Sequence, residues 1–172
     1  MSLSPVEEHR KAAESLVVRF CAVVTSDAVY EGRRRDEVTP LIASLVTEAG
    51  HILINAVIVP NKHEEIRKAV TMATKECDVV IVTGGTGISR KDLSVDVVKE
   101  LCVKDLPGFG ELFRYLTFTR YGTAAMATRA FACATGSALV FVTPGSKDAV
   151  NMALNELILP EVKHLIYEIR KS

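Results

Sequence analysis

The chain has 172 residues, of which 48% are apolar, and its 21 Lys and Arg residues are balanced by 21 Asp and Glu residues. This length and composition predict one globular domain with a substantial core. The balanced charge and the absence of Trp argue against a nucleic-acid partner, and the lack of a signal peptide or membrane-spanning run leads us to expect a cytoplasmic protein with no membrane partner.

Hydrophobic periodicity predicts alternating strands and helices along the chain. Strands are expected at 17–25, 52–59, 79–82 and 138–142, and helices at 36–49, 64–76, 93–103, 111–118, 147–157 and 160–170. The opening β-α-β-α-β order implies right-handed crossovers and a mostly parallel sheet with helices on both faces. The prediction is a three-layer α/β sandwich in which residues 16–172 form one domain and residues 1–15 form an N-terminal extension.

The cysteines and histidines show no metal-binding pattern. The four cysteines are far apart, and none belongs to a CxxC pair: Cys21, Cys77, Cys102 and Cys133. Three of them sit in or beside apolar segments, so we expect buried free thiols in a reducing compartment. The four histidines are scattered as well, which argues against a zinc site.

The most informative segment is VVIVTGGTGISRKD, residues 79–92. Its apolar start is typical of a strand that is buried on both faces. The glycines that follow, Gly84, Gly85 and Gly87, allow a tight turn and bring backbone N–H groups close to an anion. Asp92 either caps the next helix or places a carboxylate beside a phosphate, a pairing that usually needs a divalent cation. The segment alone predicts a phosphate or nucleotide site.

Three polar or glycine-rich turns follow predicted strands, at residues 25–27, 83–87 and 143–146. Each turn alone is an ordinary connector, because Gly, Pro, Ser and Asp are common turn residues. Parallel strands end on the same edge of a sheet, so the three turns are expected to converge into one binding rim. Ser146, at the start of a predicted helix, is compatible both with an N-cap and with an anion contact.

The loop after the first strand, VYEGRRR, is flanked by Asp27 and Asp36. Asp36 is compatible with a cap of the next helix, and Asp27 with a turn. The run at residues 33–35 is compatible with phosphate binding, but a solvated loop is the simpler expectation. Because the chain contains neither a GxxxxGK[ST] loop nor a GxGxxG after its first strand, its residues indicate only an α/β domain that binds a nucleotide or phosphate, with a metal left open.

Four motifs together resemble the MoaB/MogA family of molybdenum cofactor biosynthesis proteins. They are TGGTGISRKD at 83–92, LPGFGELFR at 106–114, TRA at 128–130 and TPGS at 143–146, and the resemblance extends from residue 17 to the C-terminus. The resemblance implies the molybdopterin-binding, MogA-like fold. It also implies an enzyme that transfers AMP from Mg-ATP to the terminal phosphate of molybdopterin, in a homotrimer or homohexamer.

The same resemblance assigns roles to residues by position. Asp92 would hold Mg²⁺ and position the reacting phosphates. The residues implied to contact the pterin or the nucleotide are Ser26, Asp27, Thr83, Gly84, Gly85, Thr86, Gly87, Glu111, Arg129, Pro144, Gly145 and Ser146. Such chemistry requires in-line positioning and neutralisation of phosphate charge, which a metal carboxylate and a glycine loop supply.

Two positions depart from the family pattern. Where the active enzymes carry Pro-Asp after the second strand, with a catalytic carboxylate, this chain has Pro60-Asn61. Asn61 keeps a carbonyl ligand but lacks the negative charge, and Glu64, close by in sequence, is a candidate to replace that charge. The loop before the first helix reads DEVT at 36–39 in place of D-x-x-G. The alternative function is therefore a non-catalytic carrier or scaffold that binds molybdopterin or a nucleotide.

Overall fold

A six-stranded sheet organises the residues that the computed structural model describes, which are 11, 13–136 and 138–171. The strands are β1 (Arg19–Thr25), β2 (Ile52–Val59), β3 (Val79–Thr83), β4 (Lys104–Asp105), β5 (Phe131–Thr135) and β6 (Ala138–Thr143). They lie in the order β2-β1-β3-β6-β5-β4. The first four in this order are mutually parallel, as predicted, so their carboxyl ends meet at one edge of the sheet.

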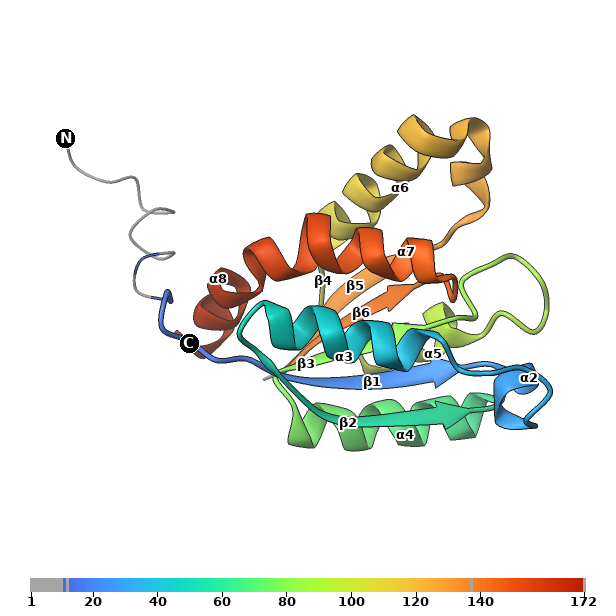
Figure 1. Cartoon of the computed structure of the whole chain (residues 1–172), viewed down its shortest axis with the longest axis horizontal. Coiled ribbons are helices and arrows are strands. Elements are labelled where there is room, and N and C mark those ends of the chain that lie inside the picture. The colour runs from blue at the N-terminus through green and yellow to red at the C-terminus, as the bar shows by residue number, and fades with distance from the viewer. Residues whose placement is uncertain (1–10, 12, 137, 172) are drawn as a thin grey trace.

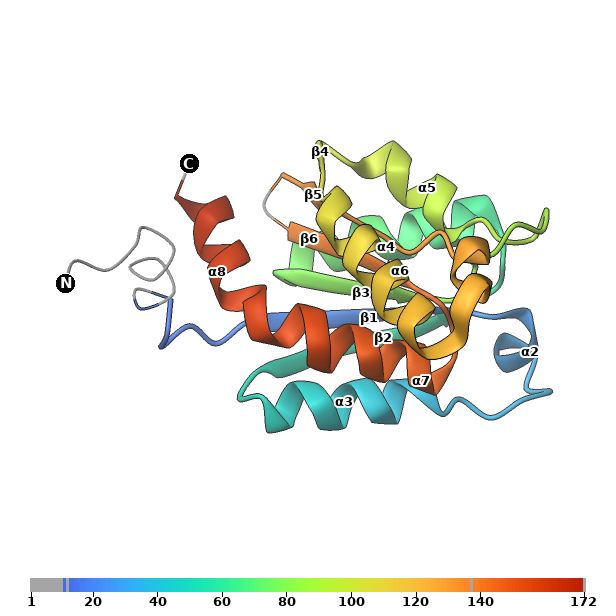
Figure 2. The same cartoon turned by 90° about the horizontal axis from the view of Figure 1, so that it is seen from above.

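Helices cover both faces of this sheet (Figure 1 and Figure 2). They are α2 (Asp27–Tyr30), α3 (Val38–Glu48), α4 (His63–Glu76), α5 (Ser94–Leu101), α6 (Pro107–Tyr121), α7 (Lys147–Met152) and α8 (Leu159–Arg170), with a 3₁₀ helix at Gly122–Ala127 and a π-helical segment at Ala153–Ile158 between α7 and α8. The helices α3, α6, α7 and α8 pack on one face, and α4 and α5 pack on the other. The predicted three-layer α/β sandwich is confirmed.

The central strand β3 is apolar at every position because it is covered on both faces. Val79 and Ile81 belong to the core on the side of α3 and α7, whereas Val80 and Val82 belong to the core on the side of α4 and α5. All four side chains are fully buried. Successive side chains of a strand point to opposite faces, so a strand between two helix layers needs an unbroken apolar run. This burial anchors the glycine loop that follows the strand.

Several elements differ from the predictions. β5 pairs antiparallel with β6, and β4 pairs antiparallel with β5, so these two strands extend the sheet beyond its parallel part. The sequence of β5 is FACAT, mostly small residues, and β4 has two residues, so neither shows the periodicity of a strand. The short helix α2 stands where a loop was predicted. Helix α6 begins at Pro107 rather than at residue 111, because Pro is well suited to a first helical turn.

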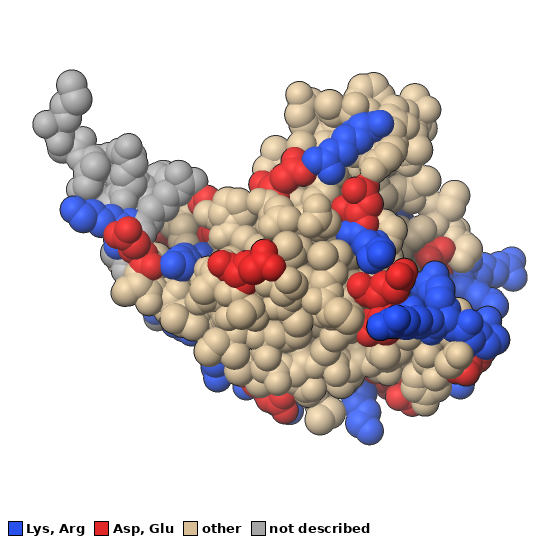
Figure 3. Space-filling view, in the orientation of Figure 1, with Lys and Arg blue, Asp and Glu red and all other residues tan. Residues whose placement is uncertain are grey.

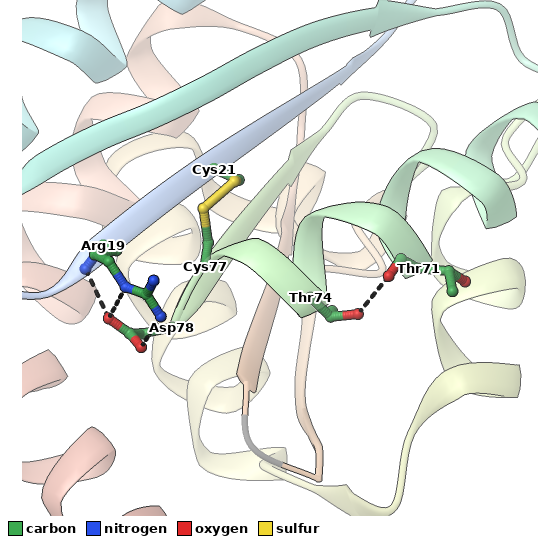
Figure 4. The surroundings of a disulfide bond; sticks show 6 residues. All are labelled: Arg19, Cys21, Thr71, Thr74, Cys77 and Asp78. Atoms are coloured by element: carbon green, nitrogen blue, oxygen red, sulfur yellow. Dashed lines mark hydrogen bonds and ion pairs between the residues drawn. A yellow bond between two sulfur atoms is a disulfide. The ribbon is translucent and has the colours of Figure 1, made fainter.

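The prediction of free thiols is wrong, because the four cysteines form two disulfides. Cys21 of β1 is bonded to Cys77, which follows α4, and Cys102, which follows α5, is bonded to Cys133 of β5. Figure 4 shows the first bond joining the strand to the end of the helix. The paired cysteines are 56 and 31 residues apart in sequence, yet each pair has a Cα–Cα distance of 5.8 Å, which suits a disulfide. The pairing depends on crossovers that sequence spacing does not reveal.

The N-terminal boundary of the domain remains a prediction. Residues 1–10 and 12 of the expected extension lie outside the described residues. Within the described part of the chain, no helix combines the length and the apolar character needed to cross a bilayer.

Candidate functional site at the carboxyl edge of the sheet

A cavity of about 490 Å³ lies at the carboxyl ends of the parallel strands. β1 pairs with β2 on one side and with β3 on the other, so the chain connections diverge at this point, where open α/β sheets bind their ligands. The walls come from the three predicted turns and from the loop before α3, and include Thr25, Ser26, Arg34, Arg35, Asp36, Glu37, Thr83, Gly84, Gly85, Gly145, Ser146 and Lys147. The expected convergence of the three turns is confirmed.

The glycines of these turns allow backbone to approach backbone. The Gly84 N–H donates to the Thr143 carbonyl with an N–O distance of 2.9 Å, and the φ angle of Gly84 is +96°. A Cβ atom at Gly84 would lie 2.2 Å from the Thr25 carbonyl oxygen, and a Cβ atom at Gly145 would lie 3.3 Å from the Gly84 Cα. A side chain on Gly84 is incompatible with this arrangement, and one on Gly145 would crowd it. The glycines therefore bring the three turns into main-chain contact, and they line the cavity without side chains of their own.

Unpartnered polar atoms are concentrated at the same edge. Among the described residues, four buried side-chain atoms have no hydrogen-bond partner: Thr25 Oγ1, Asn61 Oδ1, Ser94 Oγ and Thr143 Oγ1. Thr25 and Thr143 end β1 and β6, Asn61 follows β2 closely, and Ser94 begins α5 against Gly85. A buried polar group without a partner costs free energy, so such groups call for an explanation. Their position indicates an edge that is built to receive a polar ligand or ordered water.

Of the threonine side chains at this edge, Thr83 was a predicted site residue, whereas Thr25 and Thr143 were not predicted as site residues. The three adjacent strands β1, β3 and β6 each end in Val-Thr, at Thr25, Thr83 and Thr143, and all three threonines are buried. The Thr83 hydroxyl donates to the Pro144 carbonyl at 3.1 Å and so ties the two neighbouring loops together. The repeated Val-Thr before each turn was a visible signal in the sequence.

Helix caps account for several of the other predicted site residues. Ser26 Oγ accepts from a backbone N–H of α2 at 3.3 Å, and Ser146 Oγ accepts from one of α7 at 3.2 Å. Asp36 accepts from two N–H groups of α3 at 2.9 and 3.1 Å. Burial opposes ionisation of Asp36, but these bonds, with one from the Thr39 side chain, outweigh it and lower the pKa of the carboxyl. Ser26, Ser146 and Asp36 therefore shape the walls of the cavity.

Asp92 folds the glycine loop upon itself. Its Oδ2 accepts from the Ser89 N–H at 2.9 Å, and a Cβ atom at Gly87 would lie 2.8 Å from that same oxygen. Hydrogen bonds from Ser89 outweigh partial burial, and with the Gly87 N–H and the charge of Arg129 they lower the pKa of the Asp92 carboxyl. The residue is therefore an anion at neutral pH, presented on a loop of defined conformation.

Arg129 also holds the glycine loop in place, through hydrogen bonds to its backbone carbonyls. Its guanidinium donates to the Gly87 carbonyl at 2.9 Å, to the Asp92 carbonyl at 2.7 Å and to both carboxylate oxygens of Asp96 at 3.0 Å. Its backbone N–H donates to the Thr86 carbonyl at 3.0 Å. The side chain is thus engaged by protein groups, and it positions the loop that carries Asp92.

The remaining predicted residues do not all meet in one place. Asp27 accepts from the Asn61 N–H at 2.8 Å, which joins α2 to the end of β2. Asp92, Arg129 and Glu111 do not line the 490 Å³ cavity. Arg129 lines a second cavity of about 440 Å³ between α5, α6 and β5, and Glu111 is exposed on α6.

The strand order, the glycine-lined cavity and the hydroxyls without a partner among the described residues define an open α/β protein with a polar crevice at its switch point. Residues 21–164 match the family described as "Probable molybdopterin binding domain". The chain is 38% identical over 171 residues to molybdenum cofactor biosynthesis protein B of Bacillus subtilis, covering 97% of this chain and 98% of that protein. The chain belongs to the MoaB/MogA family of molybdenum cofactor biosynthesis proteins.

Solved structures support the same assignment. The tungsten cofactor synthesizing protein MoaB from Pyrococcus furiosus superposes with a TM-score of 0.83 at 36% identity, covering 90% of this chain and 98% of that chain. A structure of MogA superposes with a TM-score of 0.81 at 23% identity, covering 88% of this chain and 99% of that chain, and supports the fold alone. The predicted MogA-like fold and the predicted family are therefore confirmed.

Proposed function

We propose that the protein binds molybdopterin and a nucleotide at this edge and transfers AMP from Mg-ATP to the terminal phosphate of molybdopterin. The observation that carries the proposal is the cavity at the switch point, lined by the main chain of Gly84, Gly85 and Gly145. Backbone N–H groups in such loops suit phosphate oxygens, and those of Gly85 and Gly145 are the candidates here because the Gly84 N–H is bonded to the Thr143 carbonyl. Membership of the family supports molybdopterin as the second substrate.

The proposed reaction needs orientation more than covalent participation by the protein. An oxygen of the molybdopterin phosphate attacks the α-phosphorus of ATP and forms a new P–O bond. The bond from the α-phosphorus to the oxygen that bridges to the β-phosphate breaks, and its electron pair leaves with pyrophosphate. The protein must hold these charged groups in line and offset their mutual repulsion.

The residues present are compatible with Mg²⁺ bound together with the nucleotide. Mg²⁺ commonly takes one or two protein carboxylates, substrate phosphates and water, and it would offset phosphate charge here. Asp92 is an ionised carboxylate held on a loop of defined conformation, so it suits a metal ligand. We assign Asp92 to the metal and Arg129 to the positioning of its loop.

Asn61 favours a second candidate, a non-catalytic protein that carries molybdopterin or a nucleotide. Its Oδ1 is buried and has no hydrogen-bond partner in the described part of the chain, and its backbone N–H donates to Asp27. The side chain thus offers a neutral oxygen at the position where the active enzymes of the family are expected to carry a carboxylate. Loss of that charge weakens a magnesium site and leaves the glycine cradle intact.

The experiment is incubation with molybdopterin and Mg-ATP, with pyrophosphate and adenylylated pterin as readouts. We expect turnover by the natural protein, a loss of roughly 100-fold or more in Asp92→Asn, and a faster reaction in Asn61→Asp. Glu48→Gln removes an exposed carboxylate at the far end of α3 and serves as the matched control. If the natural protein and Asp92→Asn both bind molybdopterin but release no pyrophosphate, the carrier function replaces the enzyme.

We also propose a homotrimer or homohexamer located in the cytoplasm. The support for self-association is an apolar stripe on α6, where Leu112, Tyr115 and Phe118 are exposed at three-residue spacing on a helix that projects from the body (Figure 1). Light scattering of the natural protein and of Tyr115→Glu tests this assembly. A monomeric natural protein would refute it.

A further inference from the structure

The arginine run at residues 33–35 divides into two kinds of residue. Arg34 and Arg35 line the 490 Å³ cavity, whereas Arg33 does not. Arg33 instead pairs with Glu31, with its Nε at 2.7 Å from the carboxylate. All three arginines are exposed, as expected for a solvated loop, but only Arg34 and Arg35 also line the cavity.

The backbone of α2 fixes this division. Ser26 caps the helix through its bond with the Val29 N–H, so the chain turns immediately after β1. The loop then folds back, with Gly32 at a φ angle of +73° and the Arg34 N–H donating to the Ala28 carbonyl at 3.0 Å. These local bonds hold the last two residues of the run against the carboxyl edge.

The charges around the cavity leave these two cations available. Two carboxylates line it, but Asp36 accepts hydrogen bonds from the first turn of α3 and Glu37 pairs with Lys147 at 3.4 Å. Within the described part of the chain, no carboxylate lies within ion-pair distance of the guanidinium of Arg34 or Arg35. Figure 3 shows Lys and Arg side chains gathered at this end of the molecule. The mouth of the cavity therefore presents two unneutralised guanidinium groups.

We propose that Arg34 and Arg35 bind the phosphate chain of the nucleotide at the mouth of this cavity. Guanidinium groups pair with phosphate oxygens in a planar, bidentate geometry, and the unpartnered, 4% exposed Thr25 side chain supplies a hydroxyl in the same cavity. The two cations also supply positive charge to an edge where Asn61 provides no carboxylate for a metal. The inference rests on the proposed function only for the identity of the nucleotide.

The test measures binding of inorganic tripolyphosphate, ATP and AMP by calorimetry, with EDTA and then with Mg²⁺. The variants are Arg34→Gln, Arg35→Gln and the pair together, and Arg33→Gln is the matched control because it removes the same charge one residue away. Each cavity arginine is expected to contribute roughly 10-fold to the affinity for tripolyphosphate and ATP, and the pair roughly 100-fold. The loss for AMP is expected to be smaller, and Arg33→Gln is expected to stay within about 3-fold of the natural protein.

Several results would overturn the inference. One is a natural protein that binds neither tripolyphosphate nor ATP. Another is an equal loss in Arg33→Gln and the double variant, which would indicate only a general effect of net charge. An equal loss for AMP and ATP would also contradict a role toward the phosphate chain. Thermal midpoints of all variants are measured to check that a loss of affinity does not come from unfolding. Failure of AMP transfer to molybdopterin, with tripolyphosphate binding still dependent on the arginines, would refute the proposed function and leave this inference standing.

Discussion

Replacing Gly84 by Ala tests whether main-chain contact at the three turns is required. Gly84 has a φ angle of +96°, and an added Cβ would lie 2.2 Å from the Thr25 carbonyl oxygen. Gly50, after α3, is the matched control, since its φ angle is +79° but a Cβ there would meet nothing within 4 Å. Both substitutions place a side chain at a positive φ angle, and only Gly84→Ala adds a collision.

The magnitude follows from these two contributions. A left-handed conformation costs a non-glycine residue about 1 kcal/mol, which is the whole expected effect of Gly50→Ala. At Gly84 the added carbon and the carbonyl must separate by roughly 0.8 Å, and overpacking of this kind costs about 2 kcal/mol more. Thr25 has little freedom to move, because it is paired with Val59 of β2 in the sheet.

Urea and thermal unfolding of the two variants, with the disulfides intact, provide the assay. We expect a lower thermal midpoint by roughly 3 °C for Gly50→Ala and by roughly 9 °C for Gly84→Ala, together with weaker ATP binding only in Gly84→Ala. Equal destabilisation by the two substitutions would refute the claim that the turns meet through their main chains.

Three further predictions concern groups that hold the fold around the site. Reduction of the disulfides, which close separations of 56 and 31 residues, is expected to cost about 3–4 kcal/mol each, seen as a lower urea midpoint with reductant; an unchanged midpoint would contradict this. Asp78 is buried, which opposes ionisation, but hydrogen bonds from Arg19 and Arg170 outweigh burial and lower the pKa of its carboxyl. The stabilisation that the ionised carboxylate contributes to the fold is therefore present above about pH 4 and is lost as the pH falls through the lowered pKa. Asp78→Asn should therefore cost about 1–2 kcal/mol at pH 7, because the two arginines that it leaves are half exposed, and progressively less in acid, measured by urea unfolding from pH 3 to 7 (Figure 4). Arg129→Lys loses the forked contacts to the glycine loop and should raise amide exchange at residues 86–92 while costing only about 1–2 kcal/mol globally; unchanged exchange would exclude the clamp.

The parallel core of the sheet could be predicted because its signals are local. The apolar run that became β3 is buried on both faces, and glycines follow it where the chain must turn with positive φ angles. The position of the site followed from one further rule, that parallel strands end on the same edge. No such signal marked β5, whose small residues depend on pairing with β6 for their conformation.

Side-chain roles within the site were less predictable. Ser146 was compatible with a cap or with an anion contact, and the structure shows that it forms the cap. Arg129 was a candidate for ligand binding, and it holds the glycine loop through atoms that lie 33 to 42 residues away in sequence. The type of a residue and its neighbours in sequence do not indicate which hydrogen-bond partners from distant segments will lie beside it in the fold.

By itself, the sequence determined the four parallel strands, the glycine turns and the family, because each depends on the chemistry of a few consecutive residues. Only the tertiary structure decided which cysteines are bonded and which arginines face the cavity. It also decided that the hydroxyls of Thr25 and Thr143 have no hydrogen-bond partner among the described residues at this edge. The disulfide pairing, the lining of the cavity and the buried hydroxyls all depend on distances between atoms that are far apart in the chain. Those distances are set by how the helices pack against the sheet.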